Sequence, residues 1–283
     1  MGRAIGPLLS APVHDSLLAA RAAGLAALEC SVDLGRSTTR VTIDGSHWIH
    51  AGVRYPFLDV CKPRTIYHWT AAGFAPVARF TTALIKLVPT EWGAPTFEID
   101  GIKMLATARL SPVADAERKV ALIRPRGKKI LDTCGGLGYF AACCLSGRSA
   151  HVHSYEKNPE VIWLRGLNPW SPDNNDSPAI PGLTLTNADV TEAIGRHADG
   201  SVDAVLHDPP RFGMAGELYS QVFYDQLARV LTRRGRLFHY TGAPNKVSSG
   251  RDLQQEVAAR LRRSGFTAEL CFDGVLGVKS GRA

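Results

Sequence analysis

From residue 128 to residue 280 the chain alternates short apolar runs with amphipathic runs, and glycines or acidic residues stand at the junctions. Short apolar runs bounded by turns predict buried strands, whereas apolar residues at every third or fourth position predict helices. Strands that alternate with helices favour a parallel sheet covered by helices on both faces. The predicted strands are 128–134, 150–158, 183–189, 201–210, 236–242 and a pair within 266–280; the predicted helices are 137–147, 159–169, 217–235 and 250–265.

The last two strands flank Asp273-Gly274 with no helix between them. Such a pair predicts an antiparallel hairpin added to the edge of the sheet. The chain therefore predicts an α/β fold, a doubly wound and mostly parallel sheet of seven strands with a terminal antiparallel hairpin.

Residues 1–110 follow a different pattern. An Ala- and Leu-rich stretch at 15–28 predicts a helix with Asp15 as its cap. From residue 31 onward, alternating residues and turn-forming glycines predict strands, including a hairpin at 97–106, although 69–89 fits neither period. Ser111 and Pro112 then mark a helix start. We expect an N-terminal helical extension (1–30), a small β-rich module (31–110) and a main domain (111–283).

Composition limits the kind of protein. Apolar residues make up 45% of the chain and charged residues 21%, which is ordinary for a folded soluble domain. The six cysteines lack paired metal-site spacing, and no apolar run reaches the length of a membrane span. We expect a cytoplasmic protein with no structural metal and no membrane contact. The oligomeric state is not indicated.

A net charge of +7 favours an anionic partner, with RNA as one candidate. Two basic clusters stand out: Arg118, Lys119, Arg124, Arg126, Lys128 and Lys129 in the first, and Arg233, Arg234 and Arg236 in the second. Solvated faces and loop ends are the simpler interpretation of either cluster.

The stretch LDTCGGLG, residues 131–138, joins a predicted strand to a predicted helix. Glycines at such a turn let a ligand approach the backbone amides and the positive end of the helix. A dinucleotide would place its pyrophosphate beside the carboxylate of Asp132, which is unfavourable. A ligand that carries an ammonium and a sulfonium group suits that carboxylate, so the turn favours S-adenosylmethionine (SAM) over NAD. A purely structural glycine turn is the simpler alternative.

The same stretch resembles motif I of the class I SAM-dependent methyltransferases, with Cys134 where the commonest form has its first glycine. The likeness continues through PTFEIDGIKM, EKNPEVIWLRGLNPWS and HDPPRFGMAGELYSQVFYDQLARVL, over about 31–279. This longer run resembles a little-characterised predicted methyltransferase family best represented in archaea. The resemblance implies a Rossmann-like fold, Glu156 on the ribose hydroxyls and Asp189 on the adenine amino group. The cofactor-binding residues that it implies are Asp132, Cys134, Gly136, Gly138, Glu156 and Asp189.

The HDPPRF stretch, residues 207–212, lies at the motif IV position. Two prolines after a strand fix an extended turn and leave carbonyls without neighbouring amide donors. The Asp208 carboxylate and the Pro209 carbonyl can then hold a substrate amine, as similar DPP-aromatic sequences do in amino-methyltransferases. His207 is a candidate proton relay with an equally simple structural role. The candidate substrate-binding residues are Arg211, which replaces the aromatic residue, Phe212 and Tyr219.

The predicted activity is methyl transfer from SAM, assisted mainly by orientation of the acceptor. The acceptor stays open between an amine in RNA, a small molecule and a protein side chain. Methylation of cytosine C5 by the covalent route is disfavoured, because the turn at 238–245 has no cysteine. Two alternatives remain: aminopropyl transfer of the polyamine-synthase type, and a SAM- or nucleic-acid-binding module without activity.

Overall fold

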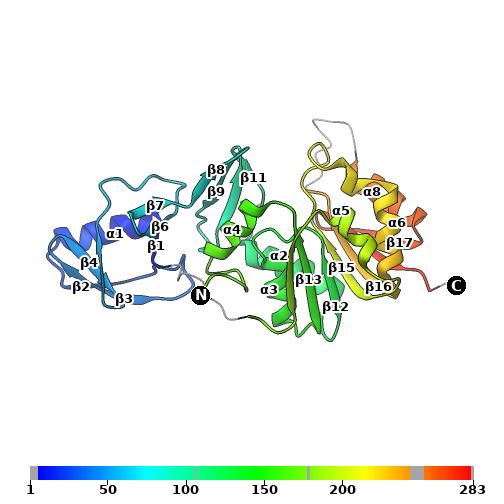
Figure 1. Cartoon of the computed structure of the whole chain (residues 1–283), viewed down its shortest axis with the longest axis horizontal. Helices are drawn as coiled ribbons and strands as arrows, with labels where there is room; N and C mark the ends of the chain where they lie inside the picture. Colours follow the sequence, from blue (N-terminus) through cyan, green and yellow to red (C-terminus); the bar gives the residue numbers. More distant parts are fainter. Residues whose placement is uncertain (1–5, 106, 177–178, 243–251, 282–283) are drawn as a thin grey trace. The chain divides into compact units, whose positions relative to one another are not determined.

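The computed structural model describes residues 6–105, 107–176, 179–242 and 252–281. The predicted features that fall on residues 1–5, on Ala106 and on 243–251 lie outside these ranges. The chain forms two compact units, shown in Figure 1. Unit 1 comprises Met1–Val113 and Trp163–Ala179, and unit 2 comprises Ala114–Ile162 and Ile180–Ala283. Each unit is described separately below.

Unit 2 is built on a seven-stranded sheet whose first five strands in the spatial order are parallel. The last two strands form an antiparallel hairpin, and one of them pairs with the fifth strand. The predicted fold class, including its closing hairpin, is confirmed. In spatial order the strands are β14 (Leu183–Asn187), β13 (His151–Glu156), β12 (Lys129–Asp132), β15 (Val202–His207), β16 (Leu231–Tyr240), β18 (Gly274–Lys279) and β17 (Phe266–Cys271).

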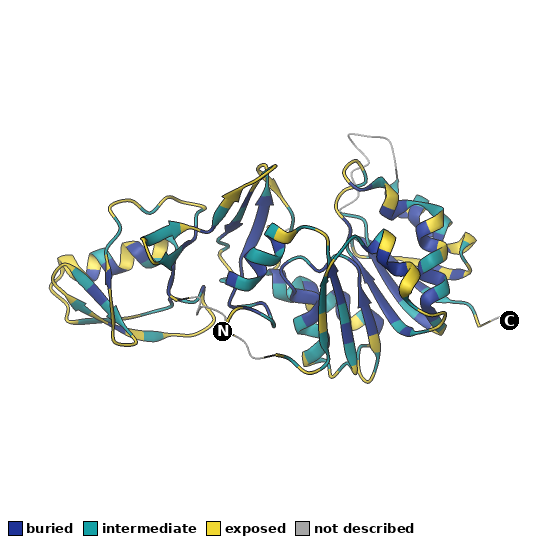
Figure 2. Cartoon of the chain, viewed as in Figure 1, coloured by how far each residue is buried: buried dark blue, intermediate teal, exposed yellow. Residues whose placement is uncertain are grey.

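Helices cover both faces of this sheet, with α2 and α3 on one side and α5, α6 and α8 on the other (Figure 1). The second face buries a large apolar core that includes Leu131, Val205, Tyr224 and Leu227. Figure 2 shows the buried residues concentrated along the central strands. The helices are α2 (Pro112–Ile123), α3 (Tyr139–Ser146), α4 (Pro159–Leu167), α5 (Val190–Ala193), α6 (Gln221–Val230) and α8 (Leu253–Arg263), with the 3₁₀ helices η1 (Ile194–Arg196) and η2 (Gly216–Tyr219).

The predicted helix at 217–235 is wrong at both ends. The hydroxyl of Ser220 accepts a hydrogen bond from the amide of Phe223 and so caps α6, which starts at Gln221. The helix stops at Val230 because the buried Leu231 joins the sheet opposite Val202. Sheet pairing therefore overrides the helical spacing of residues 231–235.

Unit 1 contains three small antiparallel sheets. Within it, Trp48 stacks on Tyr55 with ring centres 4.7 Å apart, at the centre of an apolar cluster. The strand orders are β1 (Leu8–Leu9), β6 (Tyr67–Thr70), β7 (Gly73–Pro76); β2 (Ala27–Cys30), β3 (Thr39–Asp44), β4 (His47–His50), β5 (Val53–Pro56); and β11 (Ile102–Lys103), β10 (Thr96–Ile99), β9 (Leu84–Val88), β8 (Ala78–Phe80).

The predicted N-terminal helix is shifted. Helix α1 spans Ala11–Ala22, with Pro12 in its first turn, and it ends before Gly24, whose φ of 66° leaves the helical region. Residues 27 and 28, predicted as the end of the helix, instead belong to β2, which pairs with β3. Residues 8–30 thus contribute two strands to the sheets of unit 1.

The segment Trp163–Ala179 belongs to unit 1, although it follows two strands of unit 2 in sequence. The guanidinium of Arg79 lies 3.8 Å from the centre of the Trp163 ring. The indole nitrogen of Trp170 donates a hydrogen bond of 3.0 Å to the carbonyl of Leu34. These contacts explain why the second half of α4 packs with residues far away in the sequence. In the described part of the chain, no helix is both long and apolar enough to cross a membrane.

Candidate active site

The candidate site lies in unit 2, at the edge of the sheet where β12, β13 and β15 end. The amide of Thr133 donates to the carbonyl of Leu206 at 3.0 Å, and the amide of Gly135 donates to that of Tyr155 at 2.7 Å. These bonds tie the turn after β12 to both neighbouring strands. Because parallel strands end at the same edge, the candidate residues after each strand are brought together.

The turn itself has the shape that its glycines allow. Gly138 occupies the left-handed region, with φ of 82°, immediately before α3, and Gly136 has φ of 49°. The amide of Gly138 donates to the carbonyl of Gly135 at 2.8 Å, which closes a tight turn. A side chain at Gly138 would be strained. The N-terminal end of α3 therefore opens onto the sheet edge, as the sequence predicted.

Two carboxylates are fixed beside this turn. Asp132 is fully buried, and its Oδ2 accepts a 2.8 Å hydrogen bond from the hydroxyl of Ser154. Glu156 accepts from the amide of Gly136 through one carboxylate oxygen and from that of Asn158 through the other, both at 2.9 Å. The structure thus attaches Glu156 directly to the glycine turn. The hydrogen bonds from the two backbone amides fix the orientation of its carboxylate.

Cys134 stands among carboxylates. Burial raises the pKa of its thiol well above the usual value, and the negative charges of Glu156, Asp132 and Asp208 raise it further. The thiol is therefore neutral, and its reactivity is suppressed. Carboxylates from the ends of three strands thus lie close enough to one small side chain to influence its ionisation.

Asp208 follows β15 directly. Burial raises the pKa of its carboxyl, Lys119 opposes that shift, and Asp115 and Asp273 add to it, which gives a pKa of about 6. Within the described residues, no hydrogen bond or ion pair engages the Asp208 carboxylate. This carboxylate is therefore charged near neutral pH and able to take up a proton under mildly acidic conditions.

A charged cluster, consisting of Asp115, Arg118, Lys119, Asp208 and Asp273, surrounds this position. The Nζ of Lys119 lies 2.6 Å from Asp115. Arg118 contacts Asp115 at 2.6 Å and Asp273 at 3.0 Å, so it links α2 to the β17–β18 turn. Lys119 is almost completely buried, and its ammonium lies 3.8 Å from the centre of the Tyr240 ring.

The turn after Asp208 is held by an aromatic residue. Pro209 is buried, and within the described residues no donor reaches its carbonyl. The hydroxyl of Tyr219, a buried residue, donates a 3.0 Å hydrogen bond to the carbonyl of Pro210. The Tyr219 ring meets Phe212 edge-on at 5.4 Å. Tyr219 therefore shapes the turn, Phe212 is half-buried beside it, and Arg211 is exposed.

His207 has a structural environment, which is a correction to the proton-relay hypothesis. The ring is fully buried; its Nε2 lies 3.0 Å from the carbonyl of Leu218 and its Nδ1 lies 2.7 Å from the hydroxyl of Thr133. Because a carbonyl only accepts, Nε2 carries the proton and Nδ1 accepts from Thr133. Burial lowers the pKa of His207 to about 4. A neutral ring with both nitrogens engaged inside the protein does not relay protons to a substrate.

The carboxylate of Asp189 binds neighbouring residues of the chain. Its Oδ1 accepts from the amide of Thr191 at 2.9 Å and so caps α5, and its Oδ2 lies 2.7 Å from Nζ of Lys157. Burial alone would raise the pKa of Asp189, but the hydrogen bonds from Lys157 and Thr191 outweigh it and lower the pKa. Asp189 is placed beyond the end of β14, while its carboxylate serves the helix cap.

Sequence reasoning missed the buried ion pair of Lys119 and Asp115. A signal for it exists, because Lys119 falls among Ala116, Val120 and Ile123 on the buried stripe of α2. A lysine at such a position requires a buried counter-charge. No comparable signal pointed to Asp273, which comes to the site through the closing hairpin. Among the described residues, no group of three His, Cys, Asp or Glu side chains is arranged to hold a metal ion.

Comparisons with known proteins agree with this architecture. The uncharacterised protein MJ1233 of Methanocaldococcus jannaschii is 43% identical over 194 residues, which cover 68% of this chain and 65% of the relative. The chain is similar to this archaeal protein over the aligned residues. The alignment thus spans somewhat less than two thirds of the relative, and no protein-family model matches the chain.

Solved structures with the same fold include two of spermidine synthase. One, in complex with the transition-state analogue AdoDATO, aligns with a TM-score of 0.58 and 17% identity, over 72% of this chain and 73% of that one. The other, from Thermotoga maritima, aligns with a TM-score of 0.56 and 17% identity, over 72% of each chain. The Rossmann-like fold that the methyltransferase resemblance implied is confirmed, and so is the likeness to an archaeal protein of unknown role.

Proposed function

We propose that the chain is a SAM-dependent methyltransferase that transfers the methyl group to an amine nitrogen. The observation that carries this proposal is the carboxylate of Asp208, with its pKa of about 6 and no hydrogen-bond partner among the described residues, beside the glycine turn after β12.

The residues present fit SAM as the cofactor. Asp132, Glu156 and Asp208 all act on the ionisation of Cys134, so negative charge converges at the carboxyl edge of the sheet. Such a site favours a cationic ligand and opposes a pyrophosphate. When bound, SAM supplies a methyl group on a positively charged sulfur, which leaves as a neutral thioether. The binding residues proposed are Asp132, Cys134, Gly136, Gly138 and Glu156, with Asp189 as a contact to the adenine through its Lys157-paired carboxylate.

The acceptor side is built from Asp208 and Pro209. The Asp208 carboxylate and the Pro209 carbonyl both accept hydrogen bonds, so together they orient an amine whose nitrogen lone pair then faces the methyl group. As the new N–C bond forms, the amine proton passes to Asp208, which the raised pKa permits. Orientation of this kind accounts for about 7–11 kcal/mol in well-aligned reactions, more than proton transfer alone.

Substrate selection falls to the residues around the turn. Arg211 and Phe212 lie on the exposed side, and Tyr219 keeps the turn in its extended shape through Pro210. An exposed arginine beside a half-buried aromatic ring suits an acceptor that carries a planar or anionic group next to its amine. This description leaves RNA, small amines and protein side chains as candidate acceptors.

A second candidate function, aminopropyl transfer from decarboxylated SAM, is favoured by one observation. The carboxylates of Asp115 and Asp273 both raise the pKa of Asp208, and Oδ1 of Asp273 is buried without a hydrogen-bond partner among the described residues. An acidic surrounding of this kind suits a polyamine acceptor.

The two candidates give different products from the same assay. The protein is incubated with a mixture of small amines and total RNA, together with either SAM or decarboxylated SAM. Mass spectrometry should detect S-adenosylhomocysteine and a methylated amine with SAM. Methylthioadenosine with an aminopropylated amine, formed only from decarboxylated SAM, would establish the second candidate. If calorimetry showed binding of neither nucleoside, both proposals would be wrong.

A further inference from the structure

Members of the two basic clusters of the sequence come together in unit 2, at the amino-terminal edge of the sheet, whereas Arg118 and Lys119 lie at the active-site edge. The amide of Gly127 donates to the carbonyl of Arg148 at 2.8 Å, and the amide of Lys129 donates to the Asp203 carboxylate at 2.9 Å. The backbone around Gly235 packs against the carbonyl of Asp203. The loops before β12, β13 and β15 and the first half of β16 therefore meet at one edge, opposite the candidate active site.

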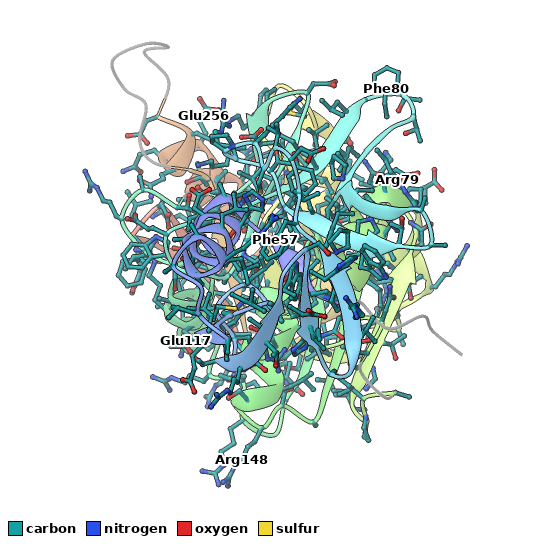
Figure 3. The ribbon with its side chains drawn as sticks, turned by 90° about the vertical axis from the view of Figure 1, so that its left-hand side faces the viewer. Phe57, Arg79, Phe80, Glu117, Arg148 and Glu256 are labelled. Atoms are coloured by element: carbon teal, nitrogen blue, oxygen red, sulfur yellow. The ribbon has the colours of Figure 1, made fainter. Side chains whose placement is uncertain are left out.

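These loops carry a basic patch, defined as Arg124, Arg126, Lys128, Arg148, Arg234 and Arg236. Arg148 extends away from the ribbon into solvent (Figure 3). Arg124, Arg126 and Arg234 are exposed as well, whereas Lys128 and Arg236 are half-buried between them. Among the described residues, none of the five arginines forms a side-chain ion pair or hydrogen bond, and the buried Nε of Arg236 has no hydrogen-bond partner.

The positive charges of the patch act on one another. Burial lowers the pKa of Lys128, and the charges of Arg236 and Arg124 lower it further, although Asp203 opposes them. Burial and the charge of Arg124 also lower the pKa of Arg236, with Glu269 as the opposing carboxylate. Three of the six cations, Arg124, Lys128 and Arg236, therefore repel one another, with Asp203 and Glu269 as the opposing carboxylates. A fold that keeps like charges this close gains free energy from an anion that neutralises them.

We propose that the basic patch binds the phosphate backbone of RNA. Five of its six residues are arginines, whose planar guanidinium groups bind phosphate oxygens through two parallel hydrogen bonds. The patch is spread over several loops, which suits a polyanion better than a single anion.

A membrane surface is the weaker fit. Helices and patches that bind membranes combine basic residues with exposed Trp, Phe or Leu side chains that enter the lipid. The large apolar side chains that are exposed in the described structure, such as Phe80, Val222 and Phe272, belong to other segments. The described loops of the patch offer charge without an apolar anchor.

The test compares binding of the full-length protein to a labelled single-stranded RNA of about 20 nucleotides, measured by fluorescence anisotropy at several salt concentrations without SAM. The variant is Arg124→Gln/Arg234→Gln/Arg236→Gln. The matched control is Arg36→Gln/Arg40→Gln/Arg109→Gln, which removes three exposed arginines elsewhere and changes the net charge equally. A second variant replaces the three patch arginines by lysine and keeps the charge.

We expect the glutamine variant to bind RNA at least about tenfold more weakly at moderate salt, with a salt dependence reduced by about two in the log–log slope. The control and the lysine variant should keep most of the affinity. Thermal melting should show that the glutamine variant is folded, because the substitution removes repulsion. Equal weakening in the variant and the control overturns the proposal, since it would reflect net charge alone.

Two further outcomes also count against the proposal. Polyglutamate bound as tightly as RNA would assign the patch to an acidic protein, and phosphatidylglycerol vesicles bound more tightly would assign it to a membrane. Methyl transfer to a small amine does not involve the patch and should be equal in all variants. Failure of RNA binding is therefore distinguishable from failure of the proposed activity.

Discussion

Asp208 is the residue whose charge the proposed reaction depends on. With a pKa of about 6, its carboxyl loses its proton as pH rises through that value. The charged form orients the amine and accepts its proton, so the rate should rise between about pH 5 and pH 7 and then level off. Asp208→Asn should lower kcat by about 10²–10⁴-fold and abolish this rise.

The measurement is the formation of S-adenosylhomocysteine across this pH range. Asp199→Asn is a suitable control, because Asp199 is a largely exposed carboxylate that pairs with Arg229. Its profile should match that of the unmodified protein. Unchanged turnover in Asp208→Asn would remove Asp208 from the reaction.

A second prediction at the scale of a single residue concerns Glu156. Its two oxygens accept from the amides of Gly136 and Asn158, beside the glycine turn where we propose that the ribose hydroxyls of SAM bind. Glu156→Gln replaces one acceptor by a donor and removes the charge. We expect SAM to bind about 10–100-fold more weakly in calorimetry, as charged hydrogen bonds contribute about 1.5–3 kcal/mol. Normal SAM affinity in a folded Glu156→Gln protein would contradict the ribose assignment.

Helix α2 brings a buried lysine to the site, which makes a prediction at the scale of an element. The charge of Lys119 lowers the pKa of Asp208 against the effect of burial. Lys119→Met keeps the apolar packing on Phe140 and Tyr240 but removes this charge. The pKa of Asp208 should then rise, and the ascending limb of the pH–rate profile should move to higher pH by about one unit or more.

A shift of the pH–rate profile distinguishes an effect of Lys119 on Asp208 from a purely structural role of Lys119. Destabilisation of the protein lowers the rate without moving the ascending limb of the profile. Lys157→Met is the matched control: Lys157 pairs with Asp189 on a different element, and its substitution should leave the limb in place. An unshifted limb in Lys119→Met would show that Lys119 does not act on Asp208.

Elements were predictable from the sequence where local signals and sheet pairing agree. Helix α3 follows its glycine turn and α2 begins at Pro112, as predicted. The local signals gave the wrong element where pairing between strands determined the structure. Leu231, for example, has helical spacing in the sequence but belongs to β16. At the site, the strand-end positions of Asp132 and Asp208 were readable, but the inward orientation of His207 was not, because it depends on Thr133 and Leu218.

At the scale of the whole molecule, sequence order is a poor guide to which residues fold together. The segment Trp163–Ala179 lies between two strands of unit 2 and packs in unit 1, through contacts such as that of Trp163 with Arg79. The segment is rich in Pro, Asn, Asp and Ser, which indicates turns but not the unit into which they pack. Unit 1 is therefore built from two separate stretches of the chain, and Ala114–Ile162, which belong to unit 2, lie between them in the sequence.

Stability against acid is a property of the whole molecule, and two fully buried histidines contribute to it. Burial lowers the pKa of His207 to about 4, and burial together with the charge of His207 lowers that of His239 well below its usual value. The tyrosine hydroxyl of Tyr224 and the carbonyl of Tyr240 occupy the two nitrogens of His239. In the unfolded chain both rings take up protons near their usual pKa, whereas the folded chain excludes them.

Because the unfolded state binds more protons, the free energy of unfolding should fall as pH drops below about 6.5, by about 1.4 kcal/mol per pH unit for each such histidine. His207→Gln keeps a donor for Leu218 and an acceptor for Thr133 but does not titrate. Denaturant unfolding of this variant should therefore show a loss between about pH 6.5 and pH 5 that is smaller by about 2 kcal/mol, whatever its stability at neutral pH. Thr133→Val, which removes a hydrogen bond but keeps the histidine, should retain the full acid sensitivity. An equal loss in His207→Gln and in the unmodified protein would show that the ring takes up its proton while the chain is folded, and His207 would then regain a place among candidate proton carriers.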